Sequence, residues 1–210
     1  MPRGAAANSR QIGGNDYHIP LDDSVAEPNT ERLAVTTARA SDYFGPRGTT
    51  QSPLGDLVIG AAIAGKQARV LGDPDQLHSY TYLLDAARTL VALGTRDDVV
   101  GEVFHIPNAP AQTTRQIIHT ISQELGTPIK VSAAPRFVLQ LMGLFNPTIA
   151  ELDEMRYEFN KPFVVAGAKA QARLGIEPTP LAKAIAETVA WFRDRNTAPQ
   201  PYARAPQAQA

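Results

Sequence analysis

Few residues of this chain have the type and spacing that catalytic chemistry requires. The sequence contains no cysteine, which excludes a cysteine nucleophile, a thiolate metal site and a disulfide. Its four histidines show no metal-ligand spacing, so no metal site is expected. Residues 60–67 are close to a phosphate-binding G-x-x-x-x-G-K-[ST] loop, but Gln67 offers no hydroxyl for Mg²⁺ and the pattern is helical. We therefore expect Gly60 to allow close helix packing and Gly65 to end that helix.

The composition is that of an ordinary globular protein. The 210 residues include 20 basic and 21 acidic side chains, which gives a net charge of -1, and 43% are hydrophobic. This balance gives no electrostatic reason to expect nucleic acid or an anionic membrane as a partner. The longest apolar stretch, residues 57–65, is too short to span a bilayer, and the N-terminus lacks the apolar region of a secretory signal. A cytoplasmic location is expected.

The elements that would position functional residues lie between two irregular ends. Residues 1–32 show no apolar period, and residues 196–210 form a proline-containing tail that is expected to be disordered. Between them, β-branched runs alternate with helical patterns, which predicts an α/β protein. The expected strands are 33–40, 69–71, 78–82, 102–106, 129–132 and 163–165. Of these, only 33–40 has the pattern of a fully buried parallel strand.

Helical patterns fill most of the remaining chain. The expected helices are 53–64, a second that ends at Gly94, a third from Thr113 to Gly126, two at 136–145 and 148–158, and a last that starts at Thr179-Pro180. We predict that the second helix turns Leu83, Ala87, Leu90 and Val91 inward. The last is predicted to face inward through Leu181, Ile185, Val189 and Phe192.

Three short segments occur in the order and spacing of a known family. They are Arg39-Ala-Ser-Asp-Tyr-Phe-Gly-Pro46, residues 70–85, and Lys169-Ala-Gln-Ala-Arg-Leu-Gly175 with Pro178 and Trp191. They resemble the R-x-x-N-x-Y-G-P, G-D-G…R-x-F-x-Y-V-x-D and K-x-x-x-x-L-G…P…W segments of the NAD-dependent epimerase/dehydratase family, the extended short-chain dehydrogenase/reductases. The resemblance covers residues 33–195 and the C-terminal half of the family. It implies a partial Rossmann-like remnant plus the small α/β substrate-binding lobe.

The resemblance does not extend to the family's cofactor chemistry. In the family, a G-x-x-G-x-x-G turn holds the pyrophosphate of NAD(P), and a Tyr-x-x-x-Lys pair on a helix exchanges a proton. The glycine motif does not occur in this sequence. Tyr157 and Lys161 have the Tyr-x-x-x-Lys spacing, but chance explains one such match. Pro162 also disfavours a helix at Lys161. We assign no catalytic residue, and NAD(P) is implied by the resemblance alone.

The resemblance does imply residues for substrate recognition: Asp42, Tyr43, His78 and Tyr80. Asp42 stands where the family has an asparagine facing the substrate, although a strand-end Asx turn explains it equally well. His78 stands where many members have an arginine that grips a nucleotide diphosphate. These two differences remove about two units of positive charge, since imidazole is mostly neutral at pH 7. We therefore expect a ligand other than a nucleotide-diphosphate sugar.

Other positions are expected to be peripheral or structural. Ala40 and Ser41 stand at most on the rim of a cofactor site, where the family's loop passes the nicotinamide ring. We expect Tyr80 and Tyr82 on opposite faces of one strand, Asp85 as a helix N-cap, and His105 in the core.

Two classes of function remain open. The first is the substrate-binding part of an NAD(P)-dependent epimerase, dehydratase or reductase for a sugar-like or hydroxy-ketone substrate, inactive in redox chemistry by itself. The second is a non-catalytic binding or interaction module, in which the exposed edge of strand 33–40 invites association with another chain. One part of a split enzyme is a further alternative, and a Rossmann-containing chain is then the expected partner. A third interpretation is that the sequence comes from a shortened reading frame and has no function of its own.

Overall fold

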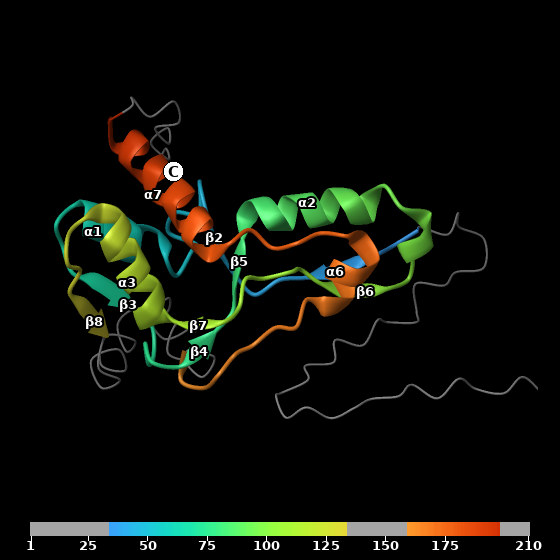
Figure 1. Cartoon of the computed structure of the whole chain (residues 1–210), viewed down its shortest axis with the longest axis horizontal. Helices are drawn as coiled ribbons and strands as arrows, with labels where there is room; N and C mark the ends of the chain where they lie inside the picture. The colour runs from blue at the N-terminus through green and yellow to red at the C-terminus, as the bar shows by residue number, and fades with distance from the viewer. Residues whose placement is uncertain (1–33, 134–158, 198–210) are drawn as a thin grey trace, which may run out of the picture. The chain divides into compact units, whose positions relative to one another are not determined.

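The computed structural model describes residues 34–133 and 159–197 (Figure 1). The helices predicted at 136–145 and 148–158, residues 1–32 and most of the C-terminal tail lie outside these ranges. The described strands are β1 (Thr37–Arg39), β2 (Asp42–Phe44), β3 (Ala68–Val70), β4 (Leu77–His78), β5 (Tyr80–Tyr82), β6 (Val103–His105), β7 (Gln112–Thr113) and β8 (Val131–Ala133). The helices are α1 (Ala61–Ile63), α2 (Leu83–Gly94), α3 (Thr114–Leu125), α6 (Ala168–Leu174) and α7 (Leu181–Thr197), with a π-helical turn η2 (Gly55–Gly60) and a 3-10 turn η3 (Asp97–Val99).

The described strands form pairs rather than one wide sheet. Pairs β1–β6, β2–β5 and β3–β8 are parallel, and β4–β7 is antiparallel. Parallel strands need long crossover connections, and helices lie within them here: α1 lies in the connection from β2 to β5, and α2 lies in the connection from β1 to β6. The α/β fold class predicted from the sequence is therefore confirmed.

The larger core lies where α3, α7 and η2 pack around β2, β3 and β5. Helix α3 starts at a capping box, in which the Thr113 hydroxyl accepts from the Gln116 amide and the Gln116 side chain accepts from the Thr113 amide. It ends at Gly126, whose φ of 68° is left-handed. Helix α7 buries Ile185, Val189 and Phe192. The predicted bounds of α3 and the inward face of α7 are confirmed.

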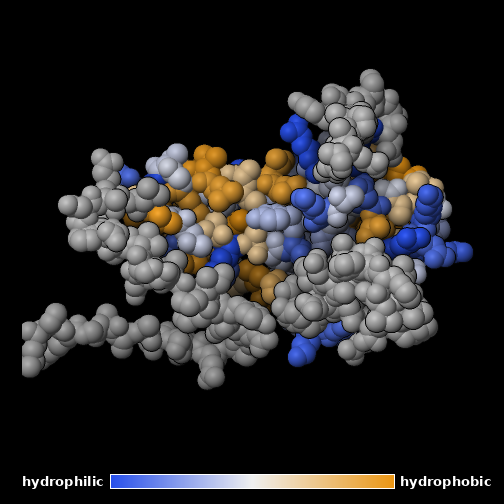
Figure 2. All heavy atoms as spheres, turned by 180° about the vertical axis from the view of Figure 1, so that it is seen from behind, coloured by the Kyte–Doolittle hydropathy of each residue, from blue (hydrophilic) through white to orange (hydrophobic). Residues whose placement is uncertain are grey.

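A smaller core lies where α2, β6 and α6 meet. It contains Leu93, Val99, Phe104 and Ala170, with Ala38 of β1 and Leu174 packed against it. The buried face of α2 carries Asp85, Ala86, Thr89 and Leu93, of which Leu93 belongs to this core. The predicted inward face is wrong, because Leu90 and Val91 are 54% and 67% exposed. Figure 2, seen from behind, shows apolar side chains on the surface over the half of the view that carries α2.

Three further expectations are corrected. Strand 33–40 is not fully buried, since β1 spans Thr37–Arg39 and Val35 before it is 52% exposed. His105 is exposed at the end of β6 rather than buried in the core. Tyr80 and Tyr82 are both buried, because side chains two residues apart on a strand lie on the same face. In the part of the chain that the structure describes, no helix is long and apolar enough to cross a membrane.

Candidate functional site

The start of the β2–β5 pair brings three of the predicted recognition residues together. In the parallel register Asp42 lies beside Tyr80, and Tyr43 lies beside Thr81. The carboxylate oxygen Oδ2 of Asp42 is 2.7 Å from Nε2 of His78, on the adjoining strand β4. The Asp42 side chain is 27% exposed and that of His78 is 3% exposed. Asp42 is therefore held in place by a buried imidazole and still reaches solvent, and no Asx turn explains this contact.

Aromatic rings enclose the imidazole of His78. It stacks on Phe159, with ring centroids 4.9 Å apart and planes at 10°, and lies 4.7 Å from Tyr80 and 5.2 Å from Phe163. Its Nδ1 is buried and has no hydrogen-bond partner in the structure. These contacts fix the ring plane, and they direct Nε2 to Asp42.

Backbone contacts hold the two phenylalanines in this position. The Phe163 amide donates to the Leu77 carbonyl (2.9 Å), and the Ser79 amide donates to the Phe163 carbonyl (2.8 Å). Gly72 has a φ of +64°, and a Cβ at this position would lie 2.5 Å from the Cβ of Phe159. Only glycine allows this approach, since both the left-handed backbone and the space exclude a side chain.

The two buried tyrosines serve packing rather than proton transfer. The Tyr80 hydroxyl bonds Thr114 Oγ1 at 2.8 Å, and burial raises the pKa of Tyr80 to about 12. Burial, followed by the hydrogen bond that its hydroxyl donates to the Glu187 carboxylate, also raises the pKa of Tyr82. Both phenols are protonated at neutral pH. Tyr43 lies apart from this group and is 42% exposed, and as the next residue of β2 its side chain lies on the face opposite to that of Asp42.

Ala40 and Ser41, predicted on the rim of a cofactor site, lie between β1 and β2. Ser41 is buried, its hydroxyl donates to the Ser79 carbonyl, and its amide donates to Thr81 Oγ1 at 3.0 Å. Thr81 Oγ1 in turn donates to Oδ1 of Asn108 at 2.8 Å. The polar groups of Ser41 are thus used within the chain, and they present no spare donor to a ligand.

The described residues do not fit the pyrophosphate of a dinucleotide. A dinucleotide cradle needs a glycine-rich turn between a strand and a helix, so that the phosphates reach backbone N–H groups. Here α2 follows β5 directly at Leu83, and α3 follows β7 at the Thr113 capping box. Neither of these two junctions contains a glycine. The connection from β2 to η2 does contain Gly45, Gly48 and Gly55, but the Gly48 and Gly55 amides donate to the Gly45 and Ser52 carbonyls, and a Cβ at Gly55 would lie 1.9 Å from the Thr49 carbonyl oxygen. Two of the glycine amides in this connection are thus used within the chain. We therefore derive no catalytic step through NAD(P) on these residues.

Asp85 is structural, but it is not the N-cap that its position in the sequence suggests. It is buried in the first turn of α2 and pairs with Arg88. Its carboxylate accepts from the Thr179 amide and from the Thr179 hydroxyl, both at 2.7 Å. Asp85 therefore ties α2 to the segment that starts α7, 94 residues away in the chain.

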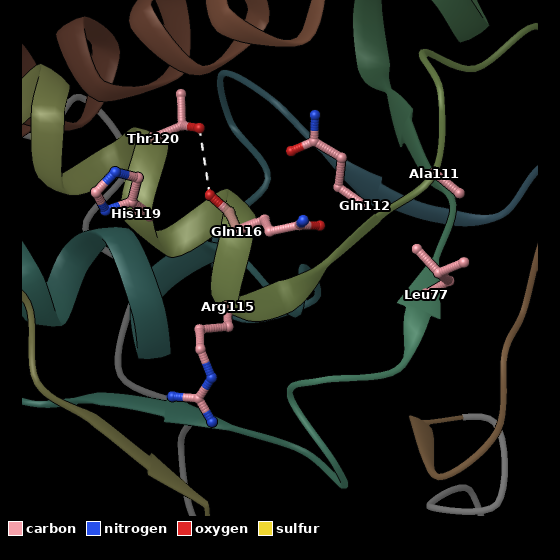
Figure 3. A pocket seen from close by; sticks show the side chains of 7 residues that line it. All are labelled: Leu77, Ala111, Gln112, Arg115, Gln116, His119 and Thr120. Atoms are coloured by element: carbon pink, nitrogen blue, oxygen red, sulfur yellow. Dashed lines mark hydrogen bonds between the residues drawn. The ribbon is translucent and has the colours of Figure 1, made fainter.

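An open hollow of about 610 Å³ lies beside α3, β4 and β7 (Figure 3). Its lining includes Leu77, Gln112, Gln116 and His119. Arg115 points away from His119, and its guanidinium pairs with Asp75 at 2.6 Å. Neither this hollow nor a neighbouring one of about 300 Å³ is lined by the four predicted recognition residues. In residues 34–133 and 159–197, no cluster of His, Asp and Glu could hold a metal ion.

The sequence did not indicate Phe159, Phe163 or Thr114 as parts of this site. Phe163 carries only an isolated bridge to His78, and Phe159 precedes it in an irregular segment. Their contacts join segments far apart in the chain, and no local period signals such contacts. The sequence shows Gly72 and His78 in one segment, but it does not show that both residues contact Phe159.

Comparison with known proteins agrees with this fold. No family model matches the chain. It is 27% identical over 172 residues to dTDP-glucose 4,6-dehydratase from Neisseria gonorrhoeae, covering 80% of this chain and 46% of that protein. Similar solved structures include UDP-glucuronic acid 4-epimerase from Bacillus cereus with UDP-glucuronic acid and NAD, at a TM-score of 0.56 and 20% identity. Another is a dTDP-glucose 4,6-dehydratase double mutant from Streptomyces venezuelae with NAD, at a TM-score of 0.59 and 19% sequence identity.

These neighbours confirm the resemblance to the NAD-dependent epimerase/dehydratase family, and they confirm that the chain has part of a Rossmann-like fold. The match covers 77% and 79% of this chain in the two structures, and 46% of each of theirs. The chain thus spans about half the length of the proteins it matches. Both structures contain NAD, which supports NAD as the cofactor that the family implies.

Proposed function

We propose that this chain is the substrate-binding part of an NAD(P)-dependent epimerase or dehydratase, that it works in the cytoplasm, and that it is inactive in redox chemistry by itself. It binds a sugar-like or hydroxy-ketone molecule beside Asp42. The observation that carries this proposal is the contact of 2.7 Å between Asp42 and His78 at the start of the β2–β5 pair. A partly exposed carboxylate in a fixed orientation accepts hydrogen bonds from ligand hydroxyls.

The same contact argues against a nucleotide diphosphate. His78 stands where many members of the family have an arginine that grips the diphosphate, and its Nε2 is directed to Asp42 rather than to a ligand. Tyr43 lies next in the chain on β2, so its exposed side chain lies on the opposite face of the strand and outside the proposed contact with the sugar. The proposed ligand is therefore neutral and rich in hydroxyl groups.

An NMR titration of the backbone amides tests this proposal. Glucose and dihydroxyacetone are expected to shift the amides of Asp42 and Tyr43 saturably, whereas dTDP-glucose and UDP-glucuronic acid are not. Asp42→Asn is expected to weaken the response, and Asp73→Asn, at a partly exposed carboxylate on a turn away from β2, is the matched control. Saturable micromolar binding of either nucleotide sugar, or no response to both neutral compounds, would contradict the proposal.

The second candidate is an interaction module without catalysis, favoured by the exposed apolar stripe of α2. Light scattering and a hydrophobic dye separate the two functions. A folded monomer that binds sugar but no dye supports the first, and an oligomer or dye-binding chain without a sugar response supports the second.

A further inference from the structure

The hollow beside α3, β4 and β7 is a second place where a ligand fits, separate from Asp42 (Figure 3). Its volume of about 610 Å³ lies within the range of about 300–1,000 Å³ that is usual for small-molecule sites. The described residues that line it carry mostly polar side chains, and Leu77 and Ala111 supply the apolar part. Leu77 is 44% exposed, so its side chain is available for a contact.

Two carboxamide groups give this hollow its hydrogen-bonding character. Gln112 lies on β7, opposite His78 of β4 in the antiparallel register. Gln116 lies in the first turn of α3, where its Oε1 accepts from the Thr113 amide at 2.8 Å. That bond fixes the orientation of the Gln116 carboxamide, so its Nε2 is left as a donor for another group.

His119 adds a further donor on the next turn of α3. Its Nε2 is 3.1 Å from the side-chain nitrogen of Gln123, and an amide nitrogen only donates. The imidazole therefore accepts at Nε2 and carries its hydrogen on Nδ1. Gln116 and His119 are three residues apart, so they lie side by side on the helix.

The charge on the described lining of the hollow is compensated. Arg115 is the only Arg, Lys, Asp or Glu among these residues, and it forms a bidentate pair with Asp75. The two N···O distances are 2.6 Å from Nε and 2.9 Å from Nη2. Figure 3 shows the Arg115 side chain pointing away from Gln112 and Gln116. An anionic ligand would therefore meet no available cation, which disfavours phosphates and carboxylates.

We propose that this hollow binds a neutral carbohydrate. Each sugar hydroxyl both donates and accepts, and so does each carboxamide, so the two sets of groups match without charge. The described lining has no Phe, Tyr or Trp on which a nucleobase could stack, whereas Leu77 and Ala111 can cover the C–H groups of a sugar ring. The capping box holds Gln116 before the ligand arrives, which lowers the cost of binding. This inference goes beyond the proposed function and does not depend on it.

An NMR titration of the backbone amides of the full chain, with maltotriose as the probe, tests the inference. We expect saturable shifts of the Gln112, Gln116 and His119 amides. Gln116→Glu keeps an acceptor for the Thr113 amide but removes the donor, so the Kd should rise about fivefold. Glu124→Gln is the matched control, because it also changes the charge by one unit at an exposed position of α3 but lines neither hollow.

A second variant tests the role of charge in the hollow. Asp75→Asn releases Arg115 from its pair, so inorganic phosphate should shift the His119 amide in this variant and not in the wild-type chain. The inference is overturned if maltotriose gives no saturable shift, if Gln116→Glu binds it as tightly as the wild type, or if phosphate acts alike on the wild type and Asp75→Asn. Asp42→Asn should leave maltotriose binding unchanged. If it abolishes the shifts on α3, the hollow is not a separate site and the inference fails.

Discussion

At the scale of single residues, the contact between Asp42 and His78 is the chemical centre of the site. A buried imidazole that donates to a carboxylate stabilises the fold and fixes the orientation of that carboxylate. A double-mutant cycle with Asp42→Asn and His78→Phe, which keeps a ring against Phe159, isolates this contact. Urea unfolding is expected to give a coupling free energy of about 1–2 kcal/mol. A coupling close to zero would mean that the two side chains are neighbours without interaction.

His105 provides a second prediction at this scale, because its environment disfavours the charged form. His105 is exposed, but the part of its imidazole that faces the protein is desolvated. This desolvation, and then the charges of Arg39 and Lys169, lower the pKa of His105 below 6.5. The unfolded chain therefore binds this proton more readily, so the contribution of His105 to stability falls as pH drops below about 6.5. NMR titration should show a pKa below 6.5 that rises in Lys169→Gln. Lys183→Gln on α7 is the control, and an unshifted pKa in the wild-type chain would contradict the prediction.

At the scale of elements, Asp85 joins α2 to the start of α7. Asp85→Ala leaves the Thr179 amide without its charged acceptor, so we expect a loss of about 2–4 kcal/mol in the free energy of unfolding. Asp98→Ala removes an exposed carboxylate paired with Arg96, and should cost about 1 kcal/mol or less. Urea unfolding of both variants measures the difference. Equal losses would show that Asp85 does not hold the two helices together.

Elements whose signals are local were predicted well from the sequence. The capping box at Thr113 and the left-handed Gly126 define α3, and the apolar spacing of α7 gave its buried face. The inward face of α2 was predicted wrongly for a physical reason. Its two apolar faces look alike in the sequence, and only the folded chain shows which one the smaller core covers.

The recognition site was predictable only in part. The motif resemblance indicated Asp42, His78 and Tyr80, and the structure places them together. Phe159 and Phe163 close the site through contacts across long stretches of chain, and no sequence period predicts them. The expected boundaries at residues 33 and 195, with irregular ends on either side, remain predictions.

At the scale of the whole molecule, the described residues combine a partly exposed carboxylate, held by a buried imidazole, with an exposed apolar stripe on α2. The chain spans about half the length of the proteins it matches, and its β5–α2 and β7–α3 junctions contain no glycine. These facts support the proposed function, in which the described residues recognise a substrate and do not hold a dinucleotide.

Calorimetric titration of the purified chain with NAD⁺ and NADP⁺ tests this proposal most directly. No saturable heat of binding is expected for either dinucleotide, because the described junctions offer no backbone cradle for a pyrophosphate. Tight binding at one dinucleotide per chain would contradict the account.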